Sequence, residues 1–336
     1  MKEYLDIFID SDYPSFIEDY LNTDTMKRIQ HVTQFCGCDY THLYHPLFYY
    51  TRFDHSLVVA HMTWHFTHDK KETIAALLHD AGTPCFAHCI DYVFGDYMNQ
   101  ESSEKSIVDI VLEDEKLKGL LDRDGISVEE LKNDSSYPIL ENKSPKLCTD
   151  RLDGVLHTVS IWLHTHSFDE IKEVYDDMIV LENEEGKPEI GFQTEEMALK
   201  FSSFVLEYAL ELQGNTDKYV MKYISEIVLL AVQKGLITLD DLYHKDEKEI
   251  VDIFSKNFSS WKIFQESLNV LGAEFEPEEF FVSFTTKKRN TIPLVSCDGG
   301  AKRITEISPE AQKMYTDIDQ YKASSYVYVK GLHSCD

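Results

Sequence analysis

The chain has 336 residues, of which 43% are hydrophobic and 27% charged, the composition of an ordinary globular protein. Its net charge is −28, from 32 Lys and Arg against 60 Asp and Glu. Such a surface repels nucleic acid and anionic lipid, so binding to a nucleic acid duplex or a membrane surface is not expected. If the substrate is a nucleotide, Lys and Arg must be concentrated where it binds.

The sequence also predicts a cytoplasmic protein. Its longest apolar runs are far shorter than the roughly 18 residues that a membrane-spanning helix needs. The N-terminal segment carries acids inside its apolar stretch and is not typical of a signal peptide. Seven cysteines at irregular spacing indicate reduced thiols.

Helical periodicity dominates up to about residue 265. The first half predicts helices over 56–68 and 72–80, an amphipathic segment over 107–112 capped by Ser103, and a loop-rich insertion over 122–146. Gly82 and Pro84 are expected to end the second of these helices.

The second half predicts helices over 150–165, 195–213, 218–234 and 246–256, and a hairpin over 178–192. Beyond about residue 277 the sequence is β-rich, with one helix starting at Ser308. We therefore expect a mainly α fold, with a helical domain over 1–265 and a small α+β lobe over 277–336.

Four residues carry the strongest chemical signal, and they occur in the order H…HD…D: His55, His79, Asp80 and Asp150. Two imidazoles and two carboxylates can hold one divalent ion, either Mn, Fe, Co, Ni or Zn, or Mg with more water. Asp80 follows the apolar run IAALL, where a charge is costly unless it is paired or bound to metal. The pattern predicts metal-assisted hydrolysis of a phosphate ester.

The surrounding motifs are MKRIQHVTQFCGCDY (26–40), TRFDHSL (51–57), HDAGTPCFAHCID (79–91) and TDRLDG (149–154). In this order they resemble the HD-domain superfamily of metal-dependent phosphohydrolases, and more closely its deoxynucleoside triphosphate triphosphohydrolase branch. The likeness covers about residues 20–256 and implies an HD-domain helical bundle. The H…HD…D pattern with its flanking residues is specific, whereas the helical remainder is not.

The resemblance implies a role for each matching position. His55, His79, Asp80 and Asp150 would be the metal ligands, and Arg52 and Arg151 would contact phosphate. Gln34 would contact the sugar 3′-hydroxyl, His88 would donate a proton and Asp91 would orient it. Tyr219 and Lys222 would make further substrate contacts.

Three positions depart from the family pattern. Thr83 replaces a second histidine of the HD loop, Ser103 stands where the family has a catalytic histidine, and Gly154 replaces a substrate-stacking tyrosine. Glu104 or His157 could take over proton transfer. Three hypotheses stay open: hydrolysis of a nucleotide or similar small phosphate ester, release of triphosphate from a deoxynucleotide, and nucleotide sensing without turnover.

The densest basic residues lie near the C-terminus: Lys287, Lys288, Arg289, Lys302 and Arg303. The simpler interpretation is a solvated hairpin and loop. The alternatives are an anion contact or a subunit interface. The family that the motifs resemble contains oligomeric enzymes, so the resemblance also implies a possible homo-oligomer.

Overall fold

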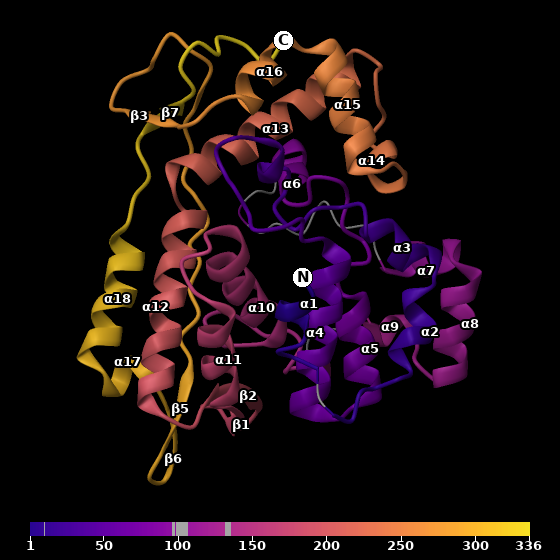
Figure 1. The fold of residues 1–336 in the computed structure, drawn as a ribbon, viewed down its shortest axis with the longest axis vertical. Coiled ribbons are helices and arrows are strands. Elements are labelled where there is room, and N and C mark those ends of the chain that lie inside the picture. Colours follow the sequence, from indigo (N-terminus) through magenta and orange to yellow (C-terminus); the bar gives the residue numbers. More distant parts are fainter. Residues whose placement is uncertain (10, 96–97, 99–106, 132–135) are drawn as a thin grey trace.

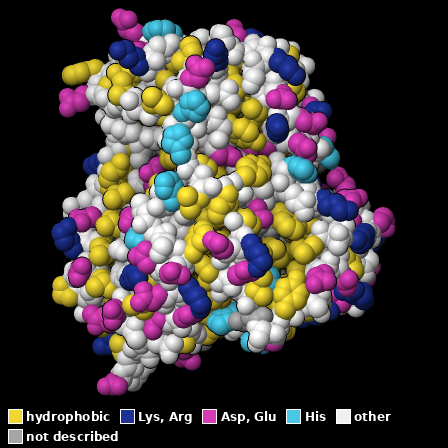
Figure 2. All heavy atoms as spheres, in the orientation of Figure 1, with side chains coloured by type: hydrophobic (Ala, Val, Ile, Leu, Met, Phe, Trp, Pro, Cys, Tyr) yellow, Lys and Arg dark blue, Asp and Glu magenta, His cyan; other side chains and the backbone are white. Residues whose placement is uncertain are grey.

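A computed structural model describes residues 1–9, 11–95, 98, 107–131 and 136–336 and shows a helix-rich, mixed α/β fold (Figure 1). Ser103 and Glu104 lie outside the described residues, as does part of the 122–146 insertion. Acidic side chains are spread widely over the face in Figure 2, in keeping with the net charge of −28.

The helices of the first half are α1 (Lys2–Leu5), α2 (Ile17–Leu21), α3 (Asp24–Ile29), the 3-10 turn η1 (Cys38–Tyr40), α4 (Arg52–Thr67), α5 (Lys70–Leu78), α6 (Cys89–Phe94), α7 (Ile107–Glu113), α8 (Glu115–Asp124), α9 (Val128–Leu131) and α10 (Thr149–His157). The predicted helix over 150–165 is α10 followed by the π-helical η3 (Thr158–Trp162).

The helices of the second half are α11 (Phe168–Asp176), α12 (Glu195–Leu212), α13 (Asn215–Gln233), α14 (Asp241–His244), α15 (Glu247–Asn257), α16 (Ser259–Gln265), α17 (Ile304–Ile307) and α18 (Pro309–Gln320). α12, α13 and α15 confirm the predicted helices to within three residues. Gly235 follows α13 with φ 67°, a backbone conformation that glycine adopts readily. Ser308 caps α18 through the Ala311 amide, as expected.

Two sheets account for the strands of the described chain: β1 (Met178–Glu182), β2 (Pro188–Phe192), β5 (Leu294–Cys297) and β6 (Gly300–Arg303) form one, and β3 (Leu271–Ala273), β7 (Tyr326–Tyr328) and β4 (Phe281–Val282) form the other. β1 and β2 are the predicted hairpin and pair antiparallel. β5 pairs parallel with β2 and antiparallel with β6, so the first sheet joins segments more than 100 positions apart in the chain.

The expected fold class, mainly α with an HD-domain helical bundle and a small C-terminal α+β lobe, is therefore wrong. The sheet that holds the central hairpin is completed by β5 and β6, and α18 packs along α12 (Figure 1). The sequence pattern predicted the hairpin and a β-rich segment after about residue 277 but not β3, and it carries no information about which distant strands pair. The domain boundary near 277 stays a prediction.

α4 lies between two hydrophobic cores. Val58 and Met62 belong to the larger core, which also contains residues of α10, α12 and α13. Val59 and Ala60 belong to a smaller core shared with α5 and α8. Because α4 is held on both sides, a side chain near its start is fixed in position. Among the described helices, none is long and apolar enough to cross a membrane.

Candidate metal centre

The start of α4 positions Arg52 and His55. Thr51 caps the helix by accepting a hydrogen bond from the Asp54 amide, and the Asp54 carboxylate accepts one from the Thr51 amide. This capping box fixes where the first turn begins. Arg52 is therefore the first helical residue, and His55 lies one turn further along, buried at 1% exposure.

The other three residues lie at helix ends that meet α4. α5 ends at Leu78, so His79 is its C-cap and Asp80 begins the turn that leads to Gly82. Asp150 lies in the first turn of α10. α4 packs against both α5 and α10, which brings the three segments together. His79 and Asp80 thus lie at a helix end, just before Gly82 and Pro84.

The ligand-type atoms of these four residues converge. His55 Nε2 lies 3.1 Å from Asp150 Oδ1, 3.2 Å from His79 Nε2 and 3.7 Å from Asp80 Oδ2. His79 Nε2 lies 3.5 Å from Asp150 Oδ1 and 3.8 Å from Asp80 Oδ2. Atoms that bind one ion at roughly 2.0–2.2 Å are themselves separated by roughly 3.0–3.5 Å. The separations of 3.1–3.8 Å in this cluster are close to that spacing, so the cluster could hold a metal ion.

Both imidazoles are turned so that Nε2 faces the cluster. His55 Nδ1 lies 2.6 Å from Asp153 Oδ2, and His79 Nδ1 lies 2.7 Å from the carbonyl oxygen of Ala76. Each acceptor fixes the proton on Nδ1 and leaves the lone pair on Nε2. Two such lone pairs 3.2 Å apart repel unless a proton or a cation lies between them.

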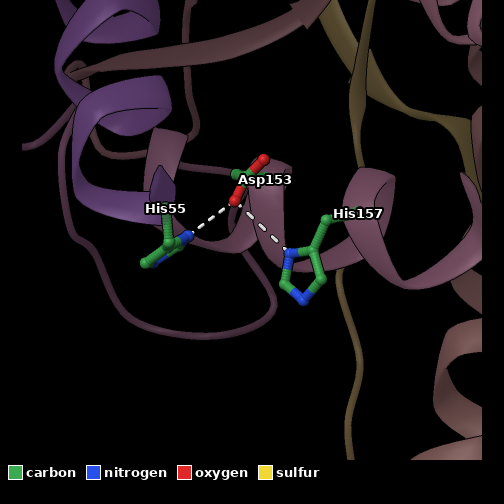
Figure 3. A group of neighbouring side chains, drawn as sticks. All are labelled: His55, Asp153 and His157. Atoms are coloured by element: carbon green, nitrogen blue, oxygen red, sulfur yellow. Dashed lines mark hydrogen bonds and ion pairs between the residues drawn. The ribbon is translucent and has the colours of Figure 1, made fainter. Parts of the chain in front are cut away.

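Asp153 is the centre of a buried hydrogen-bond network (Figure 3). Its Oδ1 accepts a hydrogen bond from Tyr4 at 2.6 Å, and its Oδ2 accepts one from Tyr50 at 2.9 Å. His157 Nδ1 lies 3.3 Å from the same Oδ2 that receives His55. Asp153 is fully buried, so its orientation, and through it that of His55, is rigidly set.

The electrostatics of the cluster favour a positive charge at its centre. Burial alone would lower the pKa of His55, but hydrogen bonds to Asp150 and Asp153 outweigh it and raise that pKa to about 10. Burial would raise the pKa of Asp80, but the charges of Arg52, His79 and His55 hold it below its usual range. A site that binds a proton this strongly is also suited to a metal cation.

Asp80 has two further partners. Arg52 Nη1 contacts Asp80 Oδ2 at 2.8 Å, and Arg52 is only 4% exposed. Thr83 donates its hydroxyl to Asp80 Oδ1 at 3.2 Å. Thr83 therefore helps to hold the Asp80 carboxylate in place.

The four residues open onto a cavity of about 1510 Å³. Its described lining has seven Lys or Arg against five Asp or Glu, which reverses the balance of the chain as a whole. The basic residues are Arg52, Lys143, Lys146, Arg151, Lys187, Lys287 and Arg289. The cavity therefore has the local concentration of positive charge that an anionic substrate requires.

Several residues predicted to bind substrate line this cavity. Gln34 and His88 do so directly, and His88 Nδ1 lies 3.1 Å from the buried Asp91 carboxylate. Burial lowers the pKa of His88, and the charge of Arg52 lowers it further. Arg151 also lines the cavity, but its guanidinium contacts Glu141 at 2.7 Å and the side chain of Asn142.

Tyr219 and Lys222 lie elsewhere in α13. Tyr219 is fully buried and stacks on Tyr223, with ring centroids 6.1 Å apart. Lys222 forms an ion pair with Glu226 and lines a smaller cavity of about 480 Å³. Neither residue lines the cavity of the metal centre.

Gly154 and His157 line the cavity on α10. A Cβ placed on Gly154 would meet nothing within 4 Å, so there is open space beside α10 at this point. His157 is directed to Asp153 through Nδ1 and stacks on Tyr50, with ring centroids 5.1 Å apart.

Sequence reasoning missed the partners that orient the cluster. Asp153 could have been recognised from the sequence, because it lies on the same helical face as Asp150. Tyr4 could not, because its contact to Asp153 spans 149 positions of the chain. Glu141, a cavity residue from the insertion, was also missed. Burial and the nearby Asp150 raise its pKa to about 7 although Arg151 opposes this.

Two overlapping groups in the described chain have the proximity to hold a metal ion: His55, His79 and Asp80, and His55, Asp153 and His157. Both use His55, and they lie on opposite sides of its ring. This buried His/Asp cluster could therefore hold a metal ion.

No protein family model matches the chain. Over 292 residues it is 25% identical to uncharacterized protein YdhJ of Bacillus subtilis, with 84% of this chain and 85% of the relative covered. Among solved structures it is similar to a hypothetical protein from Aquifex aeolicus, with a TM-score of 0.52, 18% identity and coverage of 94% and 91%. The second likeness shows a shared fold, and neither printed name gives a function.

Proposed function

We propose that the chain is a metal-dependent phosphohydrolase that acts on a nucleotide or a related small phosphate ester. The observation that carries the proposal is the convergence of two imidazole Nε2 atoms and two carboxylates, Asp80 and Asp150, on one wall of a cavity rich in Lys and Arg. Resemblance of the motifs to HD-domain phosphohydrolases supports the same reaction class.

We assign the ion to His55, His79, Asp80 and Asp150, not to the group that includes Asp153. Asp153 already accepts hydrogen bonds from Tyr4, Tyr50 and His55 on its two oxygens, and it does not line the cavity. Its geometry suits an outer partner that orients a ligand imidazole. The four-residue set has open space beside it, which a substrate requires.

A divalent ion held there would neutralise phosphate charge and lower the pKa of a water molecule that it binds. Imidazole and carboxylate donors suit Mn, Fe, Co, Ni or Zn, and Mg with additional water. The identity of the ion is left open by this donor set.

The remaining steps are assigned to side chains of the same cavity. Arg52, fixed by Asp80, would stabilise negative charge on the phosphoryl group. His88 Nδ1 is engaged by Asp91, so His88 Nε2 is the nitrogen left to give a proton to the leaving oxygen. An anionic substrate beside His88 would raise its pKa again and so favour the protonated form.

Two other functions stay open. Release of triphosphate from a deoxynucleotide follows from the closer resemblance, and Gln34 in the cavity favours it. Nucleotide sensing without turnover follows from Thr83, Ser103 and Gly154, since each departs from a family position used in binding or proton transfer.

The proposal is tested by metal analysis of the purified protein, coupled to a nucleotide panel with product identification. Wild-type protein should contain metal and hydrolyse at least one phosphate compound, and Asp80→Ala and Asp150→Ala should lose both properties. Inorganic triphosphate as the product would identify the triphosphohydrolase activity. Tight binding without turnover across several divalent metals would identify the sensor, and full activity in either variant would end the proposal.

A further inference from the structure

The connection between β4 and β5 runs past α12 from the smaller sheet to the larger one (Figure 1). We call residues 283–293 of this connection the strap. Thr286, Lys287 and Arg289 of the strap line the same cavity as the candidate metal centre. None of these three residues lies in the motifs that resemble HD-domain phosphohydrolases.

The strap is held in place on both sides of these residues. The ring of Phe284 packs edge-on against Tyr92 of α6, with centroids 5.2 Å apart. Further along, Ser144 donates a hydrogen bond to the Asn290 carbonyl at 2.9 Å, and Tyr315 donates one to the Thr291 carbonyl at 2.7 Å. Lys287 and Arg289 therefore extend from a fixed backbone.

The three consecutive basic residues of the strap do not all face the same way. Lys287 and Arg289 line the cavity. Lys288, between them, donates to the carbonyl oxygens of Ile318 and Tyr321 at 3.2 and 2.6 Å, on the side of α18. Two of the three adjacent basic residues thus face the cavity and the third stabilises the strap.

The charge of Arg289 is felt around the cavity. Burial lowers the pKa of His88, and both Arg52 and Arg289 lower it further. Burial raises the pKa of Asp217 to about 8, and Arg289 opposes that rise. His88 thus lies within electrostatic range of one arginine at the metal centre and of another on the strap.

We propose that Lys287 and Arg289 form an anion-binding subsite in this cavity and that it takes a second phosphate group of the substrate, apart from the one that is cleaved. This inference rests on the proposed phosphohydrolase function. Guanidinium and ammonium groups make charge-assisted hydrogen bonds to phosphate. The cavity, at about 1510 Å³, exceeds the 300–1,000 Å³ of typical small-ligand sites, so it has room for a substrate that spans both positions.

The second phosphate could be attached to the first or carried on a different carbon atom. Three probes separate these sources: thymidine 5′-monophosphate, thymidine 5′-diphosphate and thymidine 3′,5′-bisphosphate. Their binding to protein loaded with Mn²⁺ is measured by titration calorimetry for wild type, for the double variant Lys287→Gln/Arg289→Gln and for the control Lys302→Gln, which changes an exposed lysine outside the described lining of the cavity.

Wild type should bind the diphosphate or the bisphosphate at least tenfold more tightly than the monophosphate. The double variant should lose this preference while its affinity for the monophosphate stays within about twofold, and Lys302→Gln should keep it. Whichever probe loses affinity identifies how the second phosphate is attached. An unchanged preference in the double variant, or an equal loss in Lys302→Gln, overturns the inference.

The hydrolysis assay on the same preparations separates this inference from the proposed function. A preference that depends on the strap, in a protein that hydrolyses no phosphate compound, leaves the subsite intact and removes the phosphohydrolase. Hydrolysis by a protein that shows no such preference would support the phosphohydrolase and overturn the subsite. Circular dichroism of the double variant should match that of wild type, and Lys287→Gln and Arg289→Gln measured singly replace the double variant if it fails to fold.

Discussion

His55 and His79 face each other through their Nε2 atoms at 3.2 Å, while each Nδ1 is held by an acceptor, Asp153 for His55 and the Ala76 carbonyl for His79. Two imidazoles that share this orientation need a positive charge between their lone pairs. Asp80 and Asp150 lie around the same point. This relationship between His55 and His79 is the basis of the proposed metal site.

Asp153 orients His55, so Asp153→Asn should weaken metal binding. The amide cannot hold the same proton on His55 Nδ1 with the strength of a carboxylate, and outer partners of this kind contribute roughly 10- to 100-fold to metal affinity. Competition with a fluorescent chelator measures the change. Hydrolysis lost in the variant should return at high metal concentration.

Tyr4→Phe is the matched control for Asp153→Asn. It removes one donor to Asp153 Oδ1 and leaves the contact to His55 in place. Its metal affinity should fall by less than Asp153→Asn lowers it. An Asp153→Asn variant that binds metal like wild type would show that this carboxylate has no such role.

His88 should affect turnover and not metal content. His88→Gln should lower kcat by roughly 100- to 10,000-fold, the usual contribution of a positioned proton donor. Asp91→Asn should have a smaller effect in the same direction, because it only loosens the orientation of His88. Metal stoichiometry and steady-state kinetics on the same samples check this, and a loss of metal in His88→Gln would contradict the assignment.

Glu247 should make the stability of the protein depend on pH. It is fully buried, and burial and then the charge of Asp39 raise its pKa well above the ordinary 4.5. The folded state therefore holds a proton that the unfolded chain releases, and stability falls as pH rises above about 4.5 towards the folded pKa. Glu247→Gln removes this effect and should raise Tm by roughly 2 °C at pH 8, with little change at pH 4.

Glu249→Gln, an exposed change on the same helix, is the control and should leave Tm nearly constant at both pH values. Thermal unfolding followed by circular dichroism gives all of these values. An equal Tm for Glu247→Gln and wild type at pH 8 would show that the buried carboxyl is not protonated in the folded state.

We expect Arg303 to stabilise the fold rather than to bind an anion. Its guanidinium contacts Glu189 at 2.5 Å and Glu184 at 2.6 Å, and so ties β6 to the β1–β2 hairpin. Glu189 is fully buried, and Arg303→Met would leave it without this partner. Breaking a buried pair in this way costs about 3–5 kcal/mol of unfolding free energy.

Denaturant unfolding of Arg303→Met and of Lys302→Met tests this expectation. Lys302 is exposed on the neighbouring position, so its variant should lie close to wild type. A change below about 1 kcal/mol for Arg303→Met would return Arg303 to the group of candidate anion contacts.

The local features of the fold were accessible from the sequence. Caps and periodicity placed α12, α13 and the hairpin, because these depend on neighbouring residues. The pairing of β5 with β2 was not accessible, since Leu294 and Gly191 meet only through the tertiary fold. The predicted fold class was wrong because the sequence does not show this pairing of distant strands.

The residues of the candidate site also differ in whether neighbouring residues in the sequence reveal them. His79 and Asp80 are adjacent, and their helix end was visible in Gly82 and Pro84. The partners Tyr4 and Tyr50 reach Asp153 from distant parts of the chain and left no local pattern. Lys287 and Arg289 were visible as charges, but only the folded strap brings them to the cavity.

The most direct measurement is the position of the metal in crystals grown with Mn²⁺, located by anomalous diffraction. We predict one peak at roughly 2.0–2.3 Å from His55 Nε2, His79 Nε2 and a carboxylate oxygen of Asp80 and of Asp150. A peak bound to Asp153 and His157, or no peak at the cluster in metal-saturated crystals, would contradict the account.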